Sequence, residues 1–351
     1  MRLEQIVPGR RPPAALAGAV LTRDLRIGGA RWPKGRRLTE ADLEAIAAAA
    51  SGPPVTVLVA AADEVHEDDA GIRLANAVVG GDPDAAALEL RGPSESRVNL
   101  HATVAGVVVV RIDVVERLNR IDPLELFTVF DGQVVAPGDL VASVKVGPHL
   151  VAEAALAAGE RVAGRGGPLV RVLPFRPVVI AVLVKEHVTG AARERFEASV
   201  RAKVSGLGAT LAAIDYVPDE ERPVAEALRR VTRGSAGARI VLTAGGASTD
   251  PADPFYRAVD ALGGRVIRHG VPSHPGSMLW LGRVGRAAVI GLPSCGAFSK
   301  ATAADLLLPR LVAGQPATAA TVARLGHGGI LTRSQRFRFP AYARNLDAPD
   351  G

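Results

Sequence analysis

Apolar runs alternate with amphipathic segments through the second half of the chain. The runs over 177–184 and 239–243 predict buried strands, because nearly every position in them is apolar. Further strands are expected over 210–214 and near Val266 and Val289. The spacing of apolar residues between these runs predicts helices, over 191–207, 219–232, 254–262 and 297–312. Elements in this order indicate a three-layer α/β domain with a mostly parallel sheet.

A capping box opens the first predicted helix of the chain. The side chain of Thr39 can accept a hydrogen bond from the backbone of Asp42, and Asp42 can accept one in return. This helix is expected to continue to Ala50. A strand over 55–60 and a helix over 67–79 follow, so the beginning of the chain has mixed α+β character.

The pattern changes to β-structure from about Pro93. A long strand is expected over 104–112, and turn residues within 126–146 predict a pair of hairpins. A short helix over 150–158 and a loose stretch over 159–168 come next. We therefore expect four parts, which are an α+β module over 1–92, a β-rich module over 93–174, the α/β domain over 175–335 and a tail over 336–351.

Composition is that of a globular protein. With 351 residues, of which 48% are hydrophobic, the chain can bury a sizeable core. The first residues lack the apolar core of a signal peptide, and no run is long enough to cross a bilayer, so we expect a cytoplasmic protein without membrane contact. Cys295 is the single cysteine, which excludes an intrachain disulfide and a cysteine-based zinc site.

The formal charge of +6 comes almost entirely from arginine rather than lysine. Guanidinium groups bind phosphate in a bidentate manner, so this bias favours a phosphate-bearing ligand, although a GC-rich genome gives the same composition. The arginines are dispersed among acids, and aromatic residues make up only 4% of the chain. A nucleic-acid partner is therefore not expected, because no stacking surface is evident.

A glycine turn follows the predicted strand over 239–243. Gly245 and Gly246 allow a sharp backbone turn whose N–H groups can converge on an anion, and the hydroxyls of Thr243 and Ser248 can add donors. A tight turn without a ligand is the alternative. Asp250 and Asp253 follow and could hold Mg²⁺ beside a phosphate, with Asp250 as the better metal ligand. Asp253 precedes a proline, so it could instead cap a helix.

Two further loops belong to the same half of the chain. The loop over 269–279 contains two histidines and the Pro275-Gly276-Ser277 segment, and we expect it to cover a pocket. For His269 and His274, a surface role is favoured over metal binding or proton transfer. The turn over 291–296 contains Cys295, which we interpret as a small pocket residue rather than a nucleophile, since no base partner is evident.

The start of the last predicted helix carries a third set of candidate ligands. Ser294 and Ser299 could donate hydrogen bonds to a phosphate or cap the helix. Lys300 lies in the first turn, where the helix dipole disfavours a cation, which indicates an anionic ligand nearby. No nucleotide-triphosphate or dinucleotide motif is present, so a motor protein or a dehydrogenase is not expected.

Taken together, these segments resemble the molybdopterin-binding domain family of molybdenum-cofactor biosynthesis. The family's Gly-Gly segment with a following Asp is similar to 245–253, its Pro-Gly segment to 275–277 and its Gly-Leu-Pro-Gly turn to 291–294. A subgroup fused to a nucleotidyltransferase is also similar over several stretches, which include 34–39, 66–68, 97–102, 263–266, 311–314 and 325–331. The likeness spans about 17 to 331, and the transferase domain itself is missing.

The resemblance implies a pocket for the terminal phosphate of molybdopterin. It also implies the ligand set that we expect here, which is Thr243, Gly245, Gly246, Ser248, Pro275, Gly276, Ser277, Pro293, Ser294, Ser299 and Lys300. In enzymatic relatives it implies Mg²⁺ with adenylylation of molybdopterin or insertion of molybdate, which would make Asp250 and Asp253 catalytic. Relatives are usually oligomeric, so a homo-oligomer is expected.

The sequence departs from the family at three places. The usual Thr-Gly-x-Glu-Leu after the first strand of the domain is not recognisable over 185–191, Ser294 replaces a glycine, and Ser96 stands where the subgroup tends to have glycine. Three functions therefore remain open. The first is an enzyme that acts on molybdopterin with ATP or molybdate, and the second is a carrier that delivers molybdopterin to a client molybdoenzyme. An unrelated phosphometabolite enzyme is a third.

Overall fold

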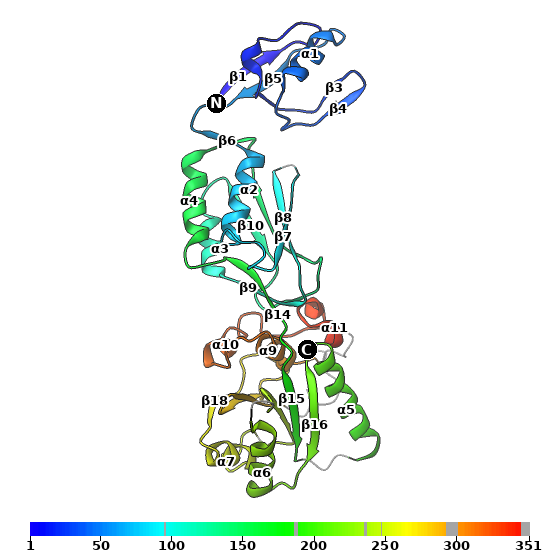
Figure 1. Cartoon of the computed structure of the whole chain (residues 1–351), viewed down its shortest axis with the longest axis vertical. Helices are drawn as coiled ribbons and strands as arrows, with labels where there is room; N and C mark the ends of the chain where they lie inside the picture. The colour runs from blue at the N-terminus through cyan, green and yellow to red at the C-terminus, as the bar shows by residue number, and fades with distance from the viewer. Residues whose placement is uncertain (95, 186–188, 235–236, 247, 293–300, 345–351) are drawn as a thin grey trace. The chain divides into compact units, whose positions relative to one another are not determined.

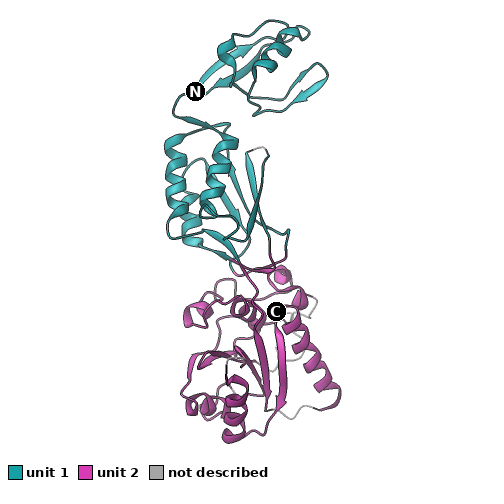
Figure 2. Cartoon of the chain, in the orientation of Figure 1, with its two compact units in different colours: residues 1–103, 109–131, 137–172 teal, residues 104–108, 132–136, 173–351 magenta. Residues whose placement is uncertain are grey.

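A computed structural model describes residues 1–94, 96–185, 189–234, 237–246, 248–292 and 301–344. The chain forms two compact units (Figure 2). Unit 1 consists of Met1–Thr103, Val109–Asp131 and Pro137–Val172, and unit 2 consists of Val104–Val108, Gly132–Ala136 and Leu173–Gly351. No helix within these described ranges is long and apolar enough to span a membrane.

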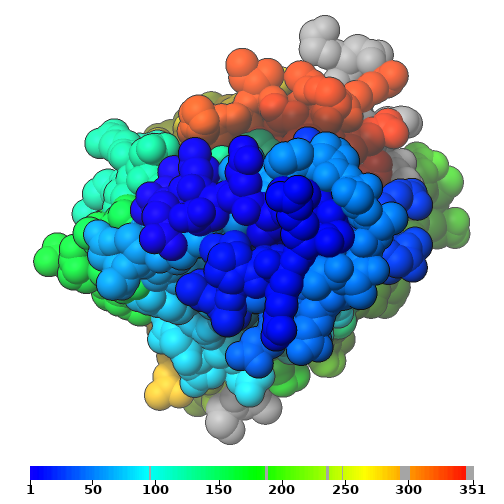
Figure 3. All heavy atoms as spheres, turned by 90° about the horizontal axis from the view of Figure 1, so that it is seen from above, coloured from blue at the N-terminus to red at the C-terminus, as the bar shows by residue number. Residues whose placement is uncertain are grey.

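Unit 1 begins with a small sheet and a capped helix. Its three strands have the order β1-β5-β2, with β1 at Arg2–Ile6, β2 at Val20–Leu21 and β5 at Val55–Val59. Helix α1 at Glu40–Ala48 packs on this sheet, and Thr39 and Asp42 form the predicted capping box. The hairpin of β3 (Leu25–Ile27) and β4 (Ala30–Trp32) places Trp32 in the same core. Figure 3 looks onto these N-terminal residues.

A second sheet of unit 1 carries helices on one face (Figure 1). Its strands have the order β10-β12-β8-β7, with bounds Leu124–Thr128, Leu140–Val146, Arg97–Ala102 and Leu88–Ser94. Helix α2 at Glu67–Val78 lies against this sheet and beside α4 at Glu153–Gly164. Arg73 on α2 joins the two helices, because its guanidinium donates at 2.7–2.9 Å to Glu153 and Glu160.

The expected strand over 104–112 is too long. Strand β9 ends at Val110, and Ile112 begins helix α3 at Ile112–Leu118. The residues that α3 buries are Val114 and Leu118, which are four positions apart and so share one helix face. Arg111 is the only residue between the apolar run of β9 and Ile112, so the end of the strand is only weakly marked by a change in hydrophobicity.

Two further expectations for this region are wrong. The segment 126–146 is not a pair of hairpins, because β10 pairs directly with β12 while β11 at Val134–Val135 pairs with β9 at Gly106–Val110. The helix expected over 150–158 starts later and runs further. Leu150–Ala152 forms β13, which pairs with β6 at Glu64–His66, and α4 continues through Gly159. The side chain of Leu124 packs closely against this glycine, so that Leu124 would have to move if residue 159 had a side chain.

Unit 2 is built on a six-stranded, mostly parallel sheet, as the sequence predicts. Its order is β16-β15-β17-β20-β19-β18, and the pairs from β16 to β20 are parallel while β19 and β18 are antiparallel additions. The strands are β15 at Val179–Val184, β16 at Thr210–Tyr216, β17 at Ile240–Ala244, β18 at Arg265–His269, β19 at Trp280–Val284 and β20 at Ala287–Gly291.

Helices cover both faces of this sheet, which makes three layers. Alternate residues of β15 face opposite sides, so Ile180 and Val182 pack with α5 (Gly190–Ser205) and α9 (Ala303–Val312). Ala181 and Leu183 pack instead with α6 (Glu221–Thr232) and α7 (Pro254–Ala261). The core therefore lies on both sides of the sheet, and the loops at the strand ends are left for binding.

The remaining elements are short. They are η1 at Ala14–Leu16, β14 at Val170–Pro174, α10 at Ala319–Ala323, η2 at Arg333–Arg338 and α11 at Ala341–Arg344. Helix α11 packs on α5 and contributes Ala343 to the core of unit 2, so the segment expected to be a tail takes part in that core.

Candidate functional site

The carboxyl ends of the parallel strands of unit 2 meet at one edge of the sheet. Lys185 directly follows β15, Asp219 lies between β16 and α6, and the Gly245-Gly246 turn follows β17. Trp280 pairs with Gly291 at the end of β20, so the loop over 270–279 reaches the same edge. Open parallel sheets bind their ligands outside this edge, which makes it the candidate site.

The glycine turn has the backbone geometry that the sequence predicts. Gly245 has a φ of +84°, a conformation that side chains other than glycine rarely adopt. Thr243 is buried, and its hydroxyl lies 3.5 Å from the carbonyl oxygen of Ile290 within the sheet. The backbone carbonyl of Ser248 accepts a 3.0 Å hydrogen bond from the Tyr256 hydroxyl. This bond fixes the end of the turn against helix α7.

The two aspartates after the turn have different surroundings. Asp253 is buried, and it caps α7 by accepting a 2.8 Å hydrogen bond from the backbone N–H of Phe255. Asp250 is exposed, and its Oδ1 accepts a 2.8 Å hydrogen bond from the backbone N–H of Ala252. The capping role predicted for Asp253 is therefore present, and the proline at the first position of α7 supports it.

Lys185 is the central charged residue of this edge, and it was not among the residues selected from the sequence. Its side chain is only 3% exposed, and its ammonium lies 3.0 Å from Oδ2 of Asp253 and 2.6 Å from Oδ1 of Asp219. The ring of Phe255 lies 5.7 Å away and adds a cation–π contact. The partners are 34 and 68 positions away along the chain, so no local motif could reveal them.

The charged groups of this cluster shift the pKa values of their neighbours. Burial lowers the pKa of Lys185, but hydrogen bonds to Asp219 and Asp253 outweigh burial and raise it overall. Burial, and secondly the charge of Asp253, raise the pKa of Tyr256 to about 12. Both side chains therefore keep their protons at neutral pH, with Lys185 as a cation.

The Pro275-Gly276-Ser277 segment packs against the start of helix α9. The backbone N–H of Ala303 donates a 2.9 Å hydrogen bond to the carbonyl of Pro275, and Leu279 donates one of 3.0 Å to the carbonyl of Gly276. Gly276 has a φ of +110°, and a Cβ atom at this position would lie 2.7 Å from the backbone nitrogen of Ala303. Only glycine fits here.

Comparison with known proteins bears on the same part of the chain. Residues 154–313 match a family model described as a probable molybdopterin-binding domain. This segment of the chain is therefore similar to the molybdopterin-binding domains of that family. The matched segment includes β15, β16, β17 and β20, whose carboxyl ends form the edge described above.

Solved structures give weaker similarities. The molybdopterin biosynthesis MoeA protein of Pyrococcus horikosii is 15% identical over 65% of this chain and 69% of its own, with a TM-score of 0.30. Molybdenum cofactor biosynthesis protein B is 16% identical over 43% of this chain and 93% of its own, with a TM-score of 0.28. No curated protein matches the chain in sequence.

Of the two predicted Mg²⁺ ligands, Asp253 is already engaged by other groups. Oδ2 of Asp253 already contacts the Lys185 ammonium, and a divalent cation beside it would meet a fixed positive charge. No group of three or more His, Cys, Asp or Glu side chains suitable for a metal occurs among the described residues. At Asp253, the Lys185 ammonium provides the positive charge that we expected from a metal ion.

Five candidate residues lie outside the described residues, which are Pro293, Ser294, Cys295, Ser299 and Lys300. The described helix start that follows them is capped by Thr302, whose hydroxyl accepts from the backbone N–H of Ala304 at 3.3 Å. Among the two histidines of the preceding loop, His269 contacts the Tyr256 ring at 4.9 Å, while His274 is exposed and pairs through its backbone with Gly329 and Leu331.

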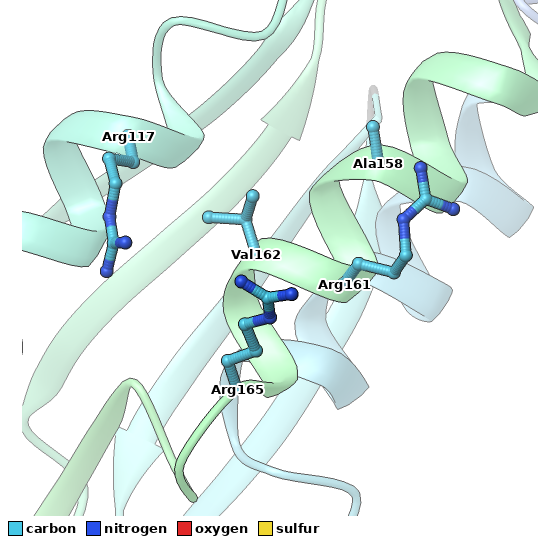
Figure 4. A pocket seen from close by; sticks show the side chains of 5 residues that line it. All are labelled: Arg117, Ala158, Arg161, Val162 and Arg165. Carbon is cyan, nitrogen blue, oxygen red and sulfur yellow. The ribbon is translucent and has the colours of Figure 1, made fainter.

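Unit 1 contains a separate concave surface with basic walls (Figure 4). This cavity of about 260 Å³ lies between α3 and α4, and its lining consists of Arg117, Ala158, Arg161, Val162 and Arg165. Arg117 is paired with Asp113 at 3.1 Å, whereas no described salt bridge includes Arg161 or Arg165. The lining is complementary to anions, because it combines three guanidinium groups with no carboxylate.

Proposed function

We propose that this chain binds molybdopterin at the carboxyl edge of the unit 2 sheet and serves molybdenum-cofactor biosynthesis by delivering it. The observation that supports this most directly is the position of the Gly245-Gly246 turn, at the end of a central strand within the matched domain. Such a turn can direct backbone N–H groups toward a phosphate without interference from side chains.

The proposal assigns the phosphate of molybdopterin to the loops around this turn. Gly245, Gly246 and Ser248 form one wall, and the Pro275–Ser277 segment forms another. Ser294, Ser299 and Lys300 complete the proposed set. The buried hydroxyl of Thr243 supports the strand rather than the ligand, since it already lies near the Ile290 carbonyl.

Delivery fits the charge arrangement better than a metal-dependent transfer. Adenylylation of molybdopterin and insertion of molybdate both need a cation that neutralises charge as the reaction proceeds. Asp253 engages Lys185 and the α7 backbone, and this leaves Asp250 as the one predicted metal ligand with an exposed carboxylate. A carrier needs only to hold the phosphate, so the proposed partners are molybdopterin, a client molybdoenzyme and a second copy of the chain.

Purification of the full chain from cells that make molybdopterin tests the proposal. Mass spectrometry of bound small molecules is expected to detect the pterin phosphate, and a Gly245→Val variant is expected to lose it, because valine disfavours a φ of +84°. A Gly263→Val variant provides the control, since Gly263 also has positive φ but lies at the opposite end of α7. Absence of pterin from the wild-type chain would refute binding.

The same preparation distinguishes a carrier from an enzyme. The carrier proposal predicts no consumption of ATP or adenylylated molybdopterin, with or without added Mg²⁺. If Mg²⁺-dependent turnover is observed and an Asp250→Ala variant abolishes it, the transferase function is correct and the carrier proposal is wrong.

A further inference from the structure

We propose that Lys185 is an anion-binding residue and that Asp219 occupies its anion position until a phosphate-bearing ligand displaces it. This inference rests on the proposed function only for the identity of the ligand. Its physical basis is the unequal burial of the three charged side chains in the cluster. The side chains of Lys185 and Asp253 are 3% and 2% exposed, whereas that of Asp219 is 59% exposed.

The Lys185–Asp253 contact is the fixed part of the cluster. Asp253 accepts from the α7 backbone with Oδ1 and contacts Lys185 with Oδ2, so both carboxylate oxygens are engaged. Separating these two side chains would pull apart opposite charges that are both buried, which is strongly unfavourable. The rest of the site must therefore adapt around this pair.

Asp219 is the exchangeable part. It lies in the loop between β16 and α6, and more than half of its side chain is already in water. Water can solvate its carboxylate when it leaves Lys185, so displacement costs little compared with displacement of Asp253. Lys185 still needs a second anionic neighbour, because a lysine has three donors and this one is shielded from solvent. A phosphate oxygen meets that need.

The position of the cluster directs the exchange toward the ligand edge. Lys185 directly follows β15, and its backbone N–H donates a 3.1 Å hydrogen bond to the carbonyl of Ala244, the residue directly before the glycine turn. A Cβ on Gly246 would lie 3.7 Å from Oδ2 of Asp253, the oxygen that contacts Lys185. The glycine turn therefore lies close to the carboxylate that contacts the Lys185 ammonium.

This arrangement predicts an unusual effect of removing a polar residue. Substitution of Asp219 by Asn eliminates the competing carboxylate and is expected to strengthen phosphate binding by about twofold to fivefold, in line with the modest strength of exposed ion pairs. A structural role of Asp219 alone would leave affinity unchanged or weaken it. Asp215→Asn is the matched control, because Asp215 lies on β16, the strand that leads into the Asp219 loop, and pairs with Arg230 at 2.9 Å.

Titration of the purified full chain with inorganic pyrophosphate by isothermal calorimetry, in the presence of EDTA, measures this affinity. Asp219→Asn is expected to bind more tightly than wild type and Asp215→Asn to match wild type. A Lys185→Met/Asp253→Asn double variant, which removes both buried charges together and keeps an amide cap for α7, is expected to lose binding. Circular dichroism confirms that each variant is folded.

The outcomes separate this inference from the proposed function. Equal or weaker binding by Asp219→Asn, full affinity in the double variant, or no anion binding by wild type and Asp219→Asn alike overturns the inference. Failure to find molybdopterin on the wild-type chain overturns the proposed function, while the pyrophosphate series still decides the role of Lys185. If pyrophosphate binds only when Mg²⁺ is added, the inference about Lys185 is also wrong.

Discussion

Lys203 on α5 and Asp305 on α9 form an ion pair that is shielded from water on all sides, with side chains 3% and 0% exposed. Asp305 also accepts a 2.9 Å hydrogen bond from the backbone N–H of Thr302 and so completes the capping box of α9. Burial, followed by the neighbouring Asp305, raises the pKa of Tyr342 well above its usual value. The Asp305 carboxylate thus links α9 to α5 and also caps the N-terminus of α9.

Removal of Lys203 alone is expected to destabilise unit 2 strongly. A Lys203→Met variant leaves Asp305 charged and buried, and the loss should be about 3 kcal/mol in the free energy of unfolding measured with urea. The Lys203→Met/Asp305→Asn double variant should recover part of this loss, because no unpaired charge remains. Arg201→Ala, which breaks an exposed pair with Glu197 on the same helix, serves as the control and should change little. Similar losses from Lys203→Met and Arg201→Ala would show that the buried pair has no special role.

Gly276→Ala should destabilise unit 2 by at least about 2 kcal/mol. The new Cβ would be strained by the φ of +110° and would also collide with the backbone of Ala303. Gly285→Ala is a useful comparison, because Gly285 has a φ of +53° with nothing within 4 Å of the added atom. The Gly285→Ala variant should lose only about 1 kcal/mol in the free energy of unfolding. Equal losses at the two positions would mean that the contact with α9 relaxes freely.

Tyr256 is expected to reduce stability at alkaline pH. Its pKa rises from 10.0 to about 12 on folding, so the unfolded chain releases this proton first. Folded Tyr256 therefore binds more protons than unfolded Tyr256 between these values, and stability falls as pH rises from 10 towards 12 by about 2 kcal/mol. Urea unfolding of wild type and Tyr256→Phe across this range measures the difference. Parallel pH profiles for the two proteins would contradict the prediction.

The capping box of α1 should make unit 1 sensitive to acid. Burial raises the pKa of Asp42, but hydrogen bonds from Arg36 and from the backbone of Thr39 outweigh it and place the pKa below its usual value of 3.8. The stabilisation is complete above that value and is lost as pH falls through the lower pKa of the folded state. An Asp42→Asn variant should therefore show a shallower loss of stability below about pH 4 than wild type. Thr39→Ala should lose about 1 kcal/mol at neutral pH, because it removes one half of the cap.

The features that could be predicted from the sequence are those that depend on residues close together along the chain. Continuous apolar runs identified the strands of unit 2, and the Thr39–Asp42 spacing identified a helix start that the structure contains. The pattern of apolar and polar residues gave wrong element boundaries where the structure depends on contacts between residues that are far apart in the sequence. Gly159 looked like a helix end, yet it lies inside α4, where the side chain of Leu124 approaches it closely.

The same distinction applies to the candidate site. The glycine turn and the cap at Asp253 follow from local order and were predicted. Lys185 was noticed only as part of a loop that departs from the family pattern, because its function depends on Asp219 and Asp253 in two other loops. Register between strands brings these three residues together, and register is set by the whole sheet rather than by any one segment.

Trp32 and Trp280, the only two tryptophans of the sequence, lie in different units. Trp32 belongs to the core around α1, and Trp280 is buried at the sheet edge of unit 2 with its ring 5.0 Å from that of Tyr256. Each unit therefore contains its own fluorophore. Trp32→Phe and Trp280→Phe variants turn emission into a readout of one unit at a time, so that the melting of either unit can be recorded in the intact chain.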